Sequence, residues 1–120
     1  MAPTLWLPGF ALPAGANVTG VEVTVWRNAS GGGIQDSDAR VVGFFPGPFE
    51  SNSLAIPGDW TTTGPSAFTY GGPSSLFGLT LDADEVNHPD FGFHIAAQNT
   101  SGATADAQVD AVEVTIYYWE

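Results

Sequence analysis

Cysteine is absent from this chain of 120 residues. Disulfide bonds and thiolate metal sites are therefore excluded, and the fold has to be held by packing and hydrogen bonds alone. A chain of this length usually forms one domain, and it buries roughly two thirds of its unfolded surface, which is enough for a core. We therefore expect residues 1–120 to form a single domain.

Basic residues are almost absent too. The chain has no lysine, and its two arginines, Arg27 and Arg40, face 13 acidic residues, which gives a net charge of −11. Binding to nucleic acid requires clustered Lys or Arg, so we expect no nucleic-acid partner, and an anionic membrane surface is disfavoured for the same reason. An acidic surface suits a basic partner, divalent cations or a salty environment, or it is simply solvated.

Long apolar runs are also missing, and no stretch approaches the roughly 20 apolar residues of a membrane span. Instead the chain holds 15 Gly and 9 Pro, and its many Val, Thr and aromatic residues favour strands over helices. Residues 18–27 alternate most clearly, with Val21, Val23 and Val25 on one face and Glu22 and Thr24 on the other. This pattern predicts a half-buried strand whose valines are in the core.

The same alternation returns near the end of the chain. In residues 109–119 the apolar Val112, Val114 and Ile116 share one face, and Glu113 lies on the other, so we expect the three apolar residues to be buried. Weaker strand patterns occupy residues 5–12, 38–45, 67–70, 76–81 and 91–98. Short strands with frequent turn signals predict an all-β fold, an antiparallel β-sandwich of jelly-roll-like type, with a small closed barrel as the alternative.

Three segments depart from the strand pattern. Residues 82–88 begin with Asp82, have Glu85 three residues later and end before Pro89, which predicts at most one short helix with a capping box. Residues 46–66 are rich in Pro, Gly, Ser and Thr and are expected to form a long loop, a common place for binding. Residues 1–8 are expected to form an extended N-terminal arm.

Acidic residues close in sequence are the first candidates for chemistry. Asp36 and Asp38 lie two residues apart, and residues 82–85 hold three acids. Acid–base catalysis needs two carboxyl groups in different environments across a cleft, which neighbours on one loop rarely provide. Neither group has the spacing of an EF-hand. We interpret both as structural or solvated, with a weak Ca²⁺ site as the alternative.

The two histidines, His88 and His94, have no third ligand spaced to complete a zinc site. The chain also has no Gly-x-Ser-x-Gly motif for a serine nucleophile. The sequence therefore predicts a protein that is not an enzyme and that has no cofactor and no metal.

Large apolar side chains gather near the two ends of the chain and in the long loop. An exposed apolar patch usually marks a contact, and an uncovered edge strand requires a partner or a blocker. The alternatives are packing within the domain and a platform for stacking sugars. The predicted interface consists of Leu5, Trp6, Leu7, Phe10, Trp60, Tyr118 and Trp119.

A series of landmarks spans most of residues 9–118. They are Gly9-Phe10, Leu-Pro-Ala-Gly-Ala at 12–16, Val-Thr-Gly-Val-Glu-Val at 18–23, Ile34-Gln35-Asp36, Trp60, Tyr70-Gly71-Gly72, Leu-Phe-Gly-Leu-Thr at 76–80, Phe91-Gly92-Phe93 and the closing segment 109–118. In these landmarks the chain resembles a structural domain of tailed-phage and prophage virion proteins, in which the third landmark tends to read I-x-G-I-x-V. The landmarks are structural, not catalytic.

The resemblance implies a β-sandwich that serves as a building block of the virion. The expected function is that of a virion accessory protein, a capsid decoration (cement) protein that binds and stabilises a phage particle through its major capsid or tail protein. A homo-oligomer is expected, with a trimer favoured. The alternative is a carbohydrate-binding, lectin-like module of a phage tail or of a secreted protein.

Overall fold

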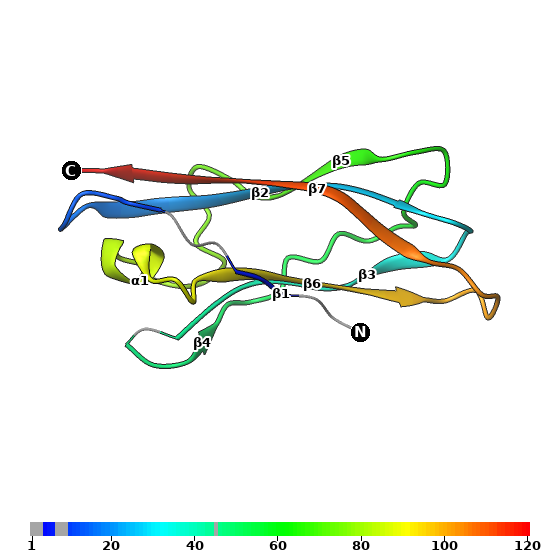
Figure 1. Cartoon of the computed structure of the whole chain (residues 1–120), viewed down its shortest axis with the longest axis horizontal. Coiled ribbons are helices and arrows are strands. Elements are labelled where there is room, and N and C mark those ends of the chain that lie inside the picture. The colour runs from blue at the N-terminus through cyan, green and yellow to red at the C-terminus, as the bar shows by residue number, and fades with distance from the viewer. Residues whose placement is uncertain (1–3, 7–9, 45) are drawn as a thin grey trace.

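The protein forms a β-sandwich of two antiparallel sheets with one short helix (Figure 1). The computed structural model describes the backbone of residues 4–6 and all of residues 10–44 and 46–120. The elements are β1 (Thr4–Trp6), β2 (Asn17–Ala29), β3 (Ile34–Gly43), β4 (Phe49–Glu50), β5 (Ser66–Gly71), α1 (Ala83–Asn87), β6 (Gly92–Asn99) and β7 (Ala107–Trp119).

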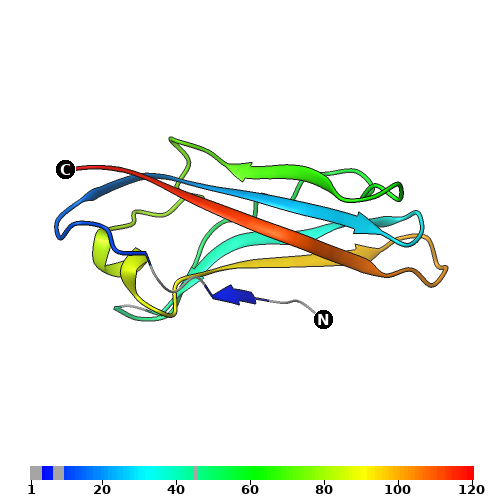
Figure 2. The same cartoon turned by 45° about the horizontal axis from the view of Figure 1, so that its top comes forward.

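One sheet has the strand order β1-β6-β3-β4 and the other has the order β5-β2-β7. The two sheets lie face to face along the length of the molecule, whose principal extents are 49 × 24 × 22 Å. Figure 2 shows β2 and β7 as the long strands of one layer and β3 and β6 as those of the other. The predicted all-β sandwich is confirmed.

The core lies between the sheets and contains the valines of β2. Val21, Val23 and Val25 are at most 1% exposed, so the face predicted for this strand is confirmed. Val41 and Phe93 pack against them from the opposite sheet. Burial of such side chains stabilises the fold by roughly 1.5–3 kcal/mol each.

The inward face of β7 is less buried than its sequence predicts. Val112, Val114 and Ile116 pack against the core cluster but are only partly buried. The reason is topological, because β7 is the last strand of its sheet and has a neighbour, β2, on one side only. The face was predicted correctly, whereas the burial of these three residues was overestimated.

Residues 76–81 are not a strand, contrary to the prediction. Phe77 has φ of 54° and Gly78 has φ of 80°, and two successive residues in the left-handed region turn the chain and end any strand. Phe77 is nevertheless 2% exposed, and its ring meets that of Phe93 edge-on at 6.4 Å. Its apolar character therefore reflects burial in the core and not strand structure.

The predicted strand over residues 5–12 is also shorter in the structure. Strand β1 ends at Trp6, residues 7–9 lie outside the described part of the chain, and residues 10–12 are not in a strand. Of the arm expected over residues 1–8, the structure describes only β1, which pairs with β6.

The short helix begins as predicted. The Asp82 carboxylate accepts a hydrogen bond from the Glu85 backbone N–H at 2.9 Å, and the Asp82 N–H donates to the Glu85 carboxylate at 3.1 Å. This reciprocal capping box satisfies two N–H groups that have no partner within the helix. Among the described residues, no helix is long and apolar enough to cross a membrane.

The chain between β3 and β5 contains β4 and covers the outer edge of β3. After β4, backbone N–H groups of Ser51, Leu54 and Trp60 donate to carbonyl groups of β3 at 2.7–2.9 Å. An open strand edge can pair with another chain, and covering it with a loop prevents this. In this way the segment predicted as a long loop protects one side of the four-stranded sheet.

Candidate functional site

A charged cluster lies inside the sandwich at Arg27. This residue continues the inward row of β2 valines, and it is 1% exposed. Its Nη1 donates to Oδ1 of Asp36 at 2.5 Å and to the Tyr70 hydroxyl at 2.6 Å. The Tyr70 hydroxyl in turn donates to Oδ2 of Asp36 at 2.7 Å. The guanidinium carbon lies 3.7 Å from the centre of the Phe68 ring, a favourable cation–π arrangement.

Asp36 also holds the segment that follows β4. Its carboxylate accepts a hydrogen bond from the Trp60 indole N–H at 2.8 Å and one from the Ile56 backbone N–H at 2.9 Å. Burial, together with the neighbouring Asp36 carboxylate, raises the pKa of Tyr70 well above its usual value. Because Arg27 and Asp36 are enclosed, this cluster is a structural element that ties the two sheets together and is closed to a substrate.

Asp36 and Asp38, treated as one acid pair in the sequence, lie on opposite faces of β3. A register irregularity between these two residues in the β3–β6 pairing separates them. Asp36 is buried, whereas Asp38 is partly exposed. The alternating pattern of β2 extends to Arg27 and could have indicated its burial, but nothing in the sequence indicates the irregularity or pairs Arg27 with Asp36.

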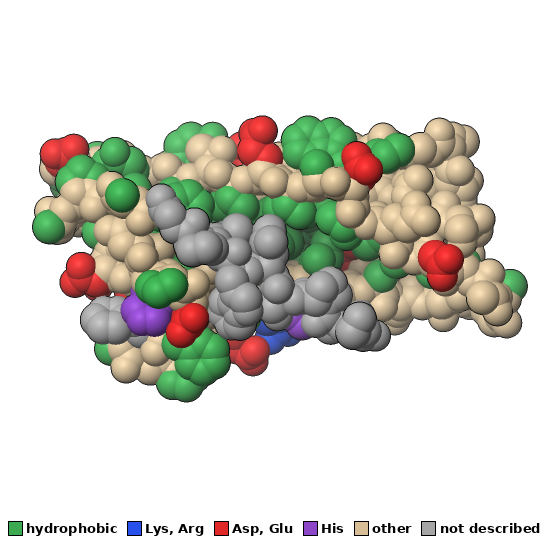
Figure 3. Space-filling model, viewed as in Figure 1, with side chains coloured by type: hydrophobic (Ala, Val, Ile, Leu, Met, Phe, Trp, Pro, Cys, Tyr) green, Lys and Arg blue, Asp and Glu red, His purple; other side chains and the backbone are tan. Residues whose placement is uncertain are grey.

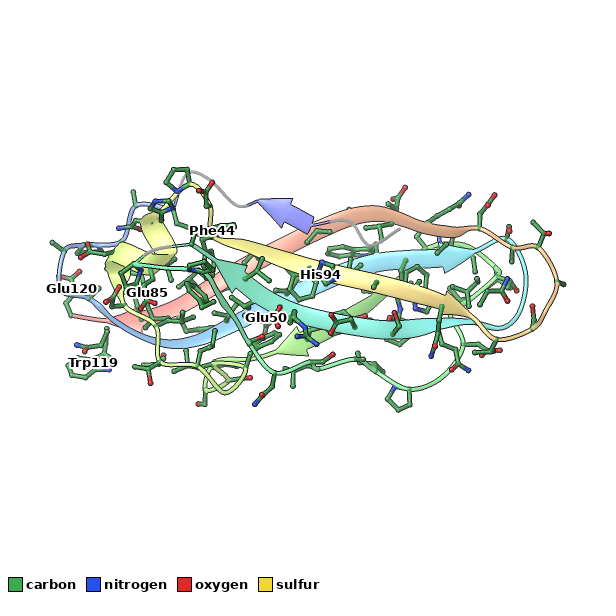
Figure 4. All side chains as sticks on the ribbon, turned by 90° about the horizontal axis from the view of Figure 1, so that it is seen from below. Phe44, Glu50, Glu85, His94, Trp119 and Glu120 are labelled. Atoms are coloured by element: carbon green, nitrogen blue, oxygen red, sulfur yellow. The ribbon has the colours of Figure 1, made fainter. Side chains whose placement is uncertain are left out.

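A pocket of about 500 Å³ opens on the outer face of the four-stranded sheet. Its polar part includes Arg40, whose guanidinium contacts Asp38 at 2.9 Å and Glu50 at 3.2 Å. His94 Nε2 lies 3.6 Å from the Asp38 carboxylate. Figure 4 shows Glu50, His94 and Phe44 on this face. The remaining lining residues are Val42, Gly43, Pro48 and Phe49.

The charges in this pocket stabilise one another. Burial alone would raise the pKa of Asp38, but hydrogen bonds from Ser53 and Arg40 hold it below its usual value. The hydrogen bond to Asp38 also raises the pKa of Arg40. The pocket therefore offers fixed hydrogen-bonding groups beside an apolar wall, which is the usual composition of a small-ligand site. Among the described residues, no group of three or more His, Asp or Glu side chains could hold a metal ion.

The outer edge of β7 is the second candidate site. Strand β7 has 13 residues and pairs with β2, and no described strand pairs with its other side. The direction of the β7 backbone groups follows from the hydrogen bonds of Val21 on β2. The Val21 N–H donates to the Ser75 carbonyl, and the Val21 carbonyl accepts from the Gly72 N–H. Because Val21 bonds on the β5 side, the alternation of an antiparallel ladder points the N–H and C=O of its partner Ile116 away from β2.

The same alternation applies to Val114 and Val112, two and four residues earlier. Their backbone groups are therefore also directed to the open edge, whereas those of Glu113 and Thr115 bond to β2. The strand ends in exposed aromatic residues, since Tyr118 is 42% and Trp119 is 61% exposed. Trp119 projects from the C-terminal end of the molecule in Figure 4.

The residues predicted to form an interface do not all lie on this surface. Tyr118 and Trp119 do. Leu7 lies outside the described residues, as do the side chains of Leu5 and Trp6. Phe10 is partly buried, and its ring packs edge-on against that of Phe91 at 6.2 Å.

Trp60 requires a correction. It is 3% exposed and its indole N–H is bonded to Asp36, so it is a core residue and presents no surface to a partner or to a sugar. Its position among Pro, Gly and Ser residues indicated a loop correctly, but it could not show that the loop folds back onto β3.

Comparison of the chain with models of protein families, with curated proteins and with solved structures finds no match.

Proposed function

We propose that this chain is a non-catalytic assembly module and acts as an accessory protein of a tailed-phage particle, as a capsid decoration protein. The observation that carries the proposal is the open edge of β7, which ends in the exposed Tyr118 and Trp119. Exposed apolar surface of this kind marks contact sites, and aromatic residues are enriched at the centres of interfaces. The resemblance in sequence to virion proteins supplies the identity of the assembly.

Charge supports the same function. With a net charge of −11, the chain repels nucleic acid and other acidic proteins, and it is attracted to a basic surface. One described sheet edge, that of β3, is covered by its own loop, while the edge of β7 is left open. Among the other edge strands, β7 with 13 residues is much longer than β5 with 6 and β1 with 3, which favours β7 as the side that meets the particle.

The test is co-sedimentation of the purified protein with heads and, separately, with tails of the phage that encodes it. Trp119→Ala should reduce attachment by about tenfold or more, as expected for a central interface aromatic worth at least roughly 1.4 kcal/mol. Phe44→Ala is the matched control, because Phe44 is 52% exposed but lies on the opposite layer. Sedimentation velocity of the purified protein by itself tests the predicted trimer.

Failure of the wild-type protein to sediment with either heads or tails would refute the proposal. Equal attachment of both variants would refute the role of the β7 end.

A second candidate function is carbohydrate binding, and the outer pocket specifically favours it. Arg40, Asp38 and Glu50 provide the hydrogen-bonding groups and Phe49 an aromatic wall, a combination that suits a sugar with polar edges and an apolar face. Binding on a glycan array that is lost in Arg40→Ala and retained in Trp119→Ala would support this function. An array without signal for the wild-type protein would exclude the glycans it displays.

A further inference from the structure

The middle of β7 has the form of a strand edge that can accept another strand. From Ala111 to Tyr117 the pairing with β2 is regular and without a shift in register. Natural proteins protect such edges with proline, lysine, bulges or short length. Strand β7 contains neither proline nor lysine, and three of its N–H groups, those of Val112, Val114 and Ile116, are directed outward.

The inward side of this edge is apolar and incompletely covered. The side chains of Val112, Val114 and Ile116 pack against the core but are only partly buried. In Figure 3, apolar side chains are visible along the opening between the two layers, between β7 and β6. An added strand with apolar side chains at alternate positions would cover this opening and extend the three-stranded sheet, as in β-strand addition.

The acidic charge around β7 indicates what kind of partner its open edge can bind. The segment from Asp106 to Glu120 also contains Asp110 and Glu113 but no basic residue. A second copy of the chain could not neutralise these acids, because Arg27 is buried against Asp36 and Arg40 is engaged by Asp38 and Glu50. Placed edge to edge at β7, two copies would also bring these acidic segments against one another, so the predicted trimer has to form through another surface.

We propose that the open edge of β7 binds an extended basic segment of a partner protein, in which Lys or Arg alternates with β-branched apolar residues. The apolar residues face the opening of the sandwich and pack beside Val112, Val114 and Ile116. The basic residues face the outer side, where Glu113 lies. This inference deepens the proposed function, on which it rests, by giving the chemistry of the particle component that is bound.

The probe is a synthetic peptide of about ten residues in which lysine and valine alternate, roughly the length of a long strand. Amide hydrogen exchange of the protein is measured by NMR with and without the peptide. The N–H groups of Val112, Val114 and Ile116 should become protected. Those of Glu113 and Thr115 already bond to β2 and should change little. The same peptide with N-methyl groups on consecutive residues keeps its charge but cannot pair through either edge, so it should not protect the amides.

Two variants separate charge from pairing. Glu113→Lys should weaken binding of the peptide by roughly threefold to fivefold, as expected for one exposed charge contact. Asp84→Lys, at an exposed position on α1 and outside β7, makes the same change in net charge and is the matched control. Val114→Pro removes an outward N–H without breaking the β2–β7 ladder and should abolish protection. The N-methylated peptide tests the same point without altering the protein.

Three results with the peptides or with the free protein would overturn the inference. The first is absence of binding, and the second is equal binding of the plain and N-methylated peptides, which would indicate charge attraction alone. The third is a dimer of the free protein in which these amides are already protected, which would make a second copy the occupant. If Val114→Pro attaches normally to particles, the inference fails while the proposed function stands. If the peptide protects the amides but no particle is bound, the proposed function fails while the strand-accepting edge stands.

Discussion

Replacing Asp36 by alanine should destabilise the protein severely, because it leaves the buried Arg27 guanidinium without its counter-ion. Both side chains are at most 1% exposed, so solvent does not screen the loss. Removing one partner of a buried ion pair costs about 3–5 kcal/mol. Trp60, Tyr70 and Ile56 would lose an acceptor at the same time.

This loss is a large fraction of the roughly 5–15 kcal/mol that stabilises a whole domain. At about 4 °C per kcal/mol for a chain of this size, the melting temperature should fall by roughly 15 °C. The measurement is urea unfolding followed by tryptophan fluorescence, together with thermal melting followed by circular dichroism. Asp106→Ala is the matched control, because Asp106 is exposed and its replacement should change stability by no more than about 0.5 kcal/mol.

The double variant Arg27→Met with Asp36→Leu provides the decisive comparison. Replacing both members of a buried ion pair by apolar groups is often neutral, so the double variant should be more stable than Asp36→Ala alone. If Asp36→Ala lowers the free energy of unfolding by less than about 1 kcal/mol, the reasoning is refuted. It is also refuted if the double variant is less stable than Asp36→Ala.

Three further predictions follow from the fold. Val23→Asp places a charge in the core and should prevent folding, whereas Thr24→Asp on the outer face should be tolerated; circular dichroism of both variants tests this. Because the pKa of Tyr70 is raised in the folded state, its contribution to stability is present below the ordinary tyrosine pKa of 10.0 and is lost as pH rises through the higher folded value. Urea unfolding above pH 10 should therefore show a loss of stability that is smaller in Tyr70→Phe than in the wild-type protein. An equal loss of stability in both proteins would contradict this prediction. With a net charge of −11, the melting temperature should rise between very low and moderate sodium chloride as screening reduces repulsion, and a flat salt dependence would show that the acids are too dispersed to repel.

Local features of this protein were determined by its sequence. Alternation of side chains places Val21, Val23 and Val25 on one face because successive residues of a strand point to opposite sides. The capping box at Asp82 and Glu85 needs only residues three positions apart. These interactions act over a few residues, so they and the all-β class could be predicted without knowing which strand pairs with which.

Non-local pairing decided the rest. Arg27 and Asp36 lie on different strands, and only the packing of the two sheets brings them together with Tyr70 and Trp60. For this reason Trp60, predicted at an interface, lies in the core.

The candidate sites depend on the tertiary structure in the same way. The outer pocket joins Arg40 and Glu50 of β3 and β4 with His94 of β6. The open edge exists because β7 is last in its sheet, and strand order follows from the closure of the whole sandwich, which no single segment of sequence encodes. The exposed Tyr118 and Trp119 could be proposed from their position in the sequence, but the outward N–H groups beside them appear only once β2 occupies the other side of β7.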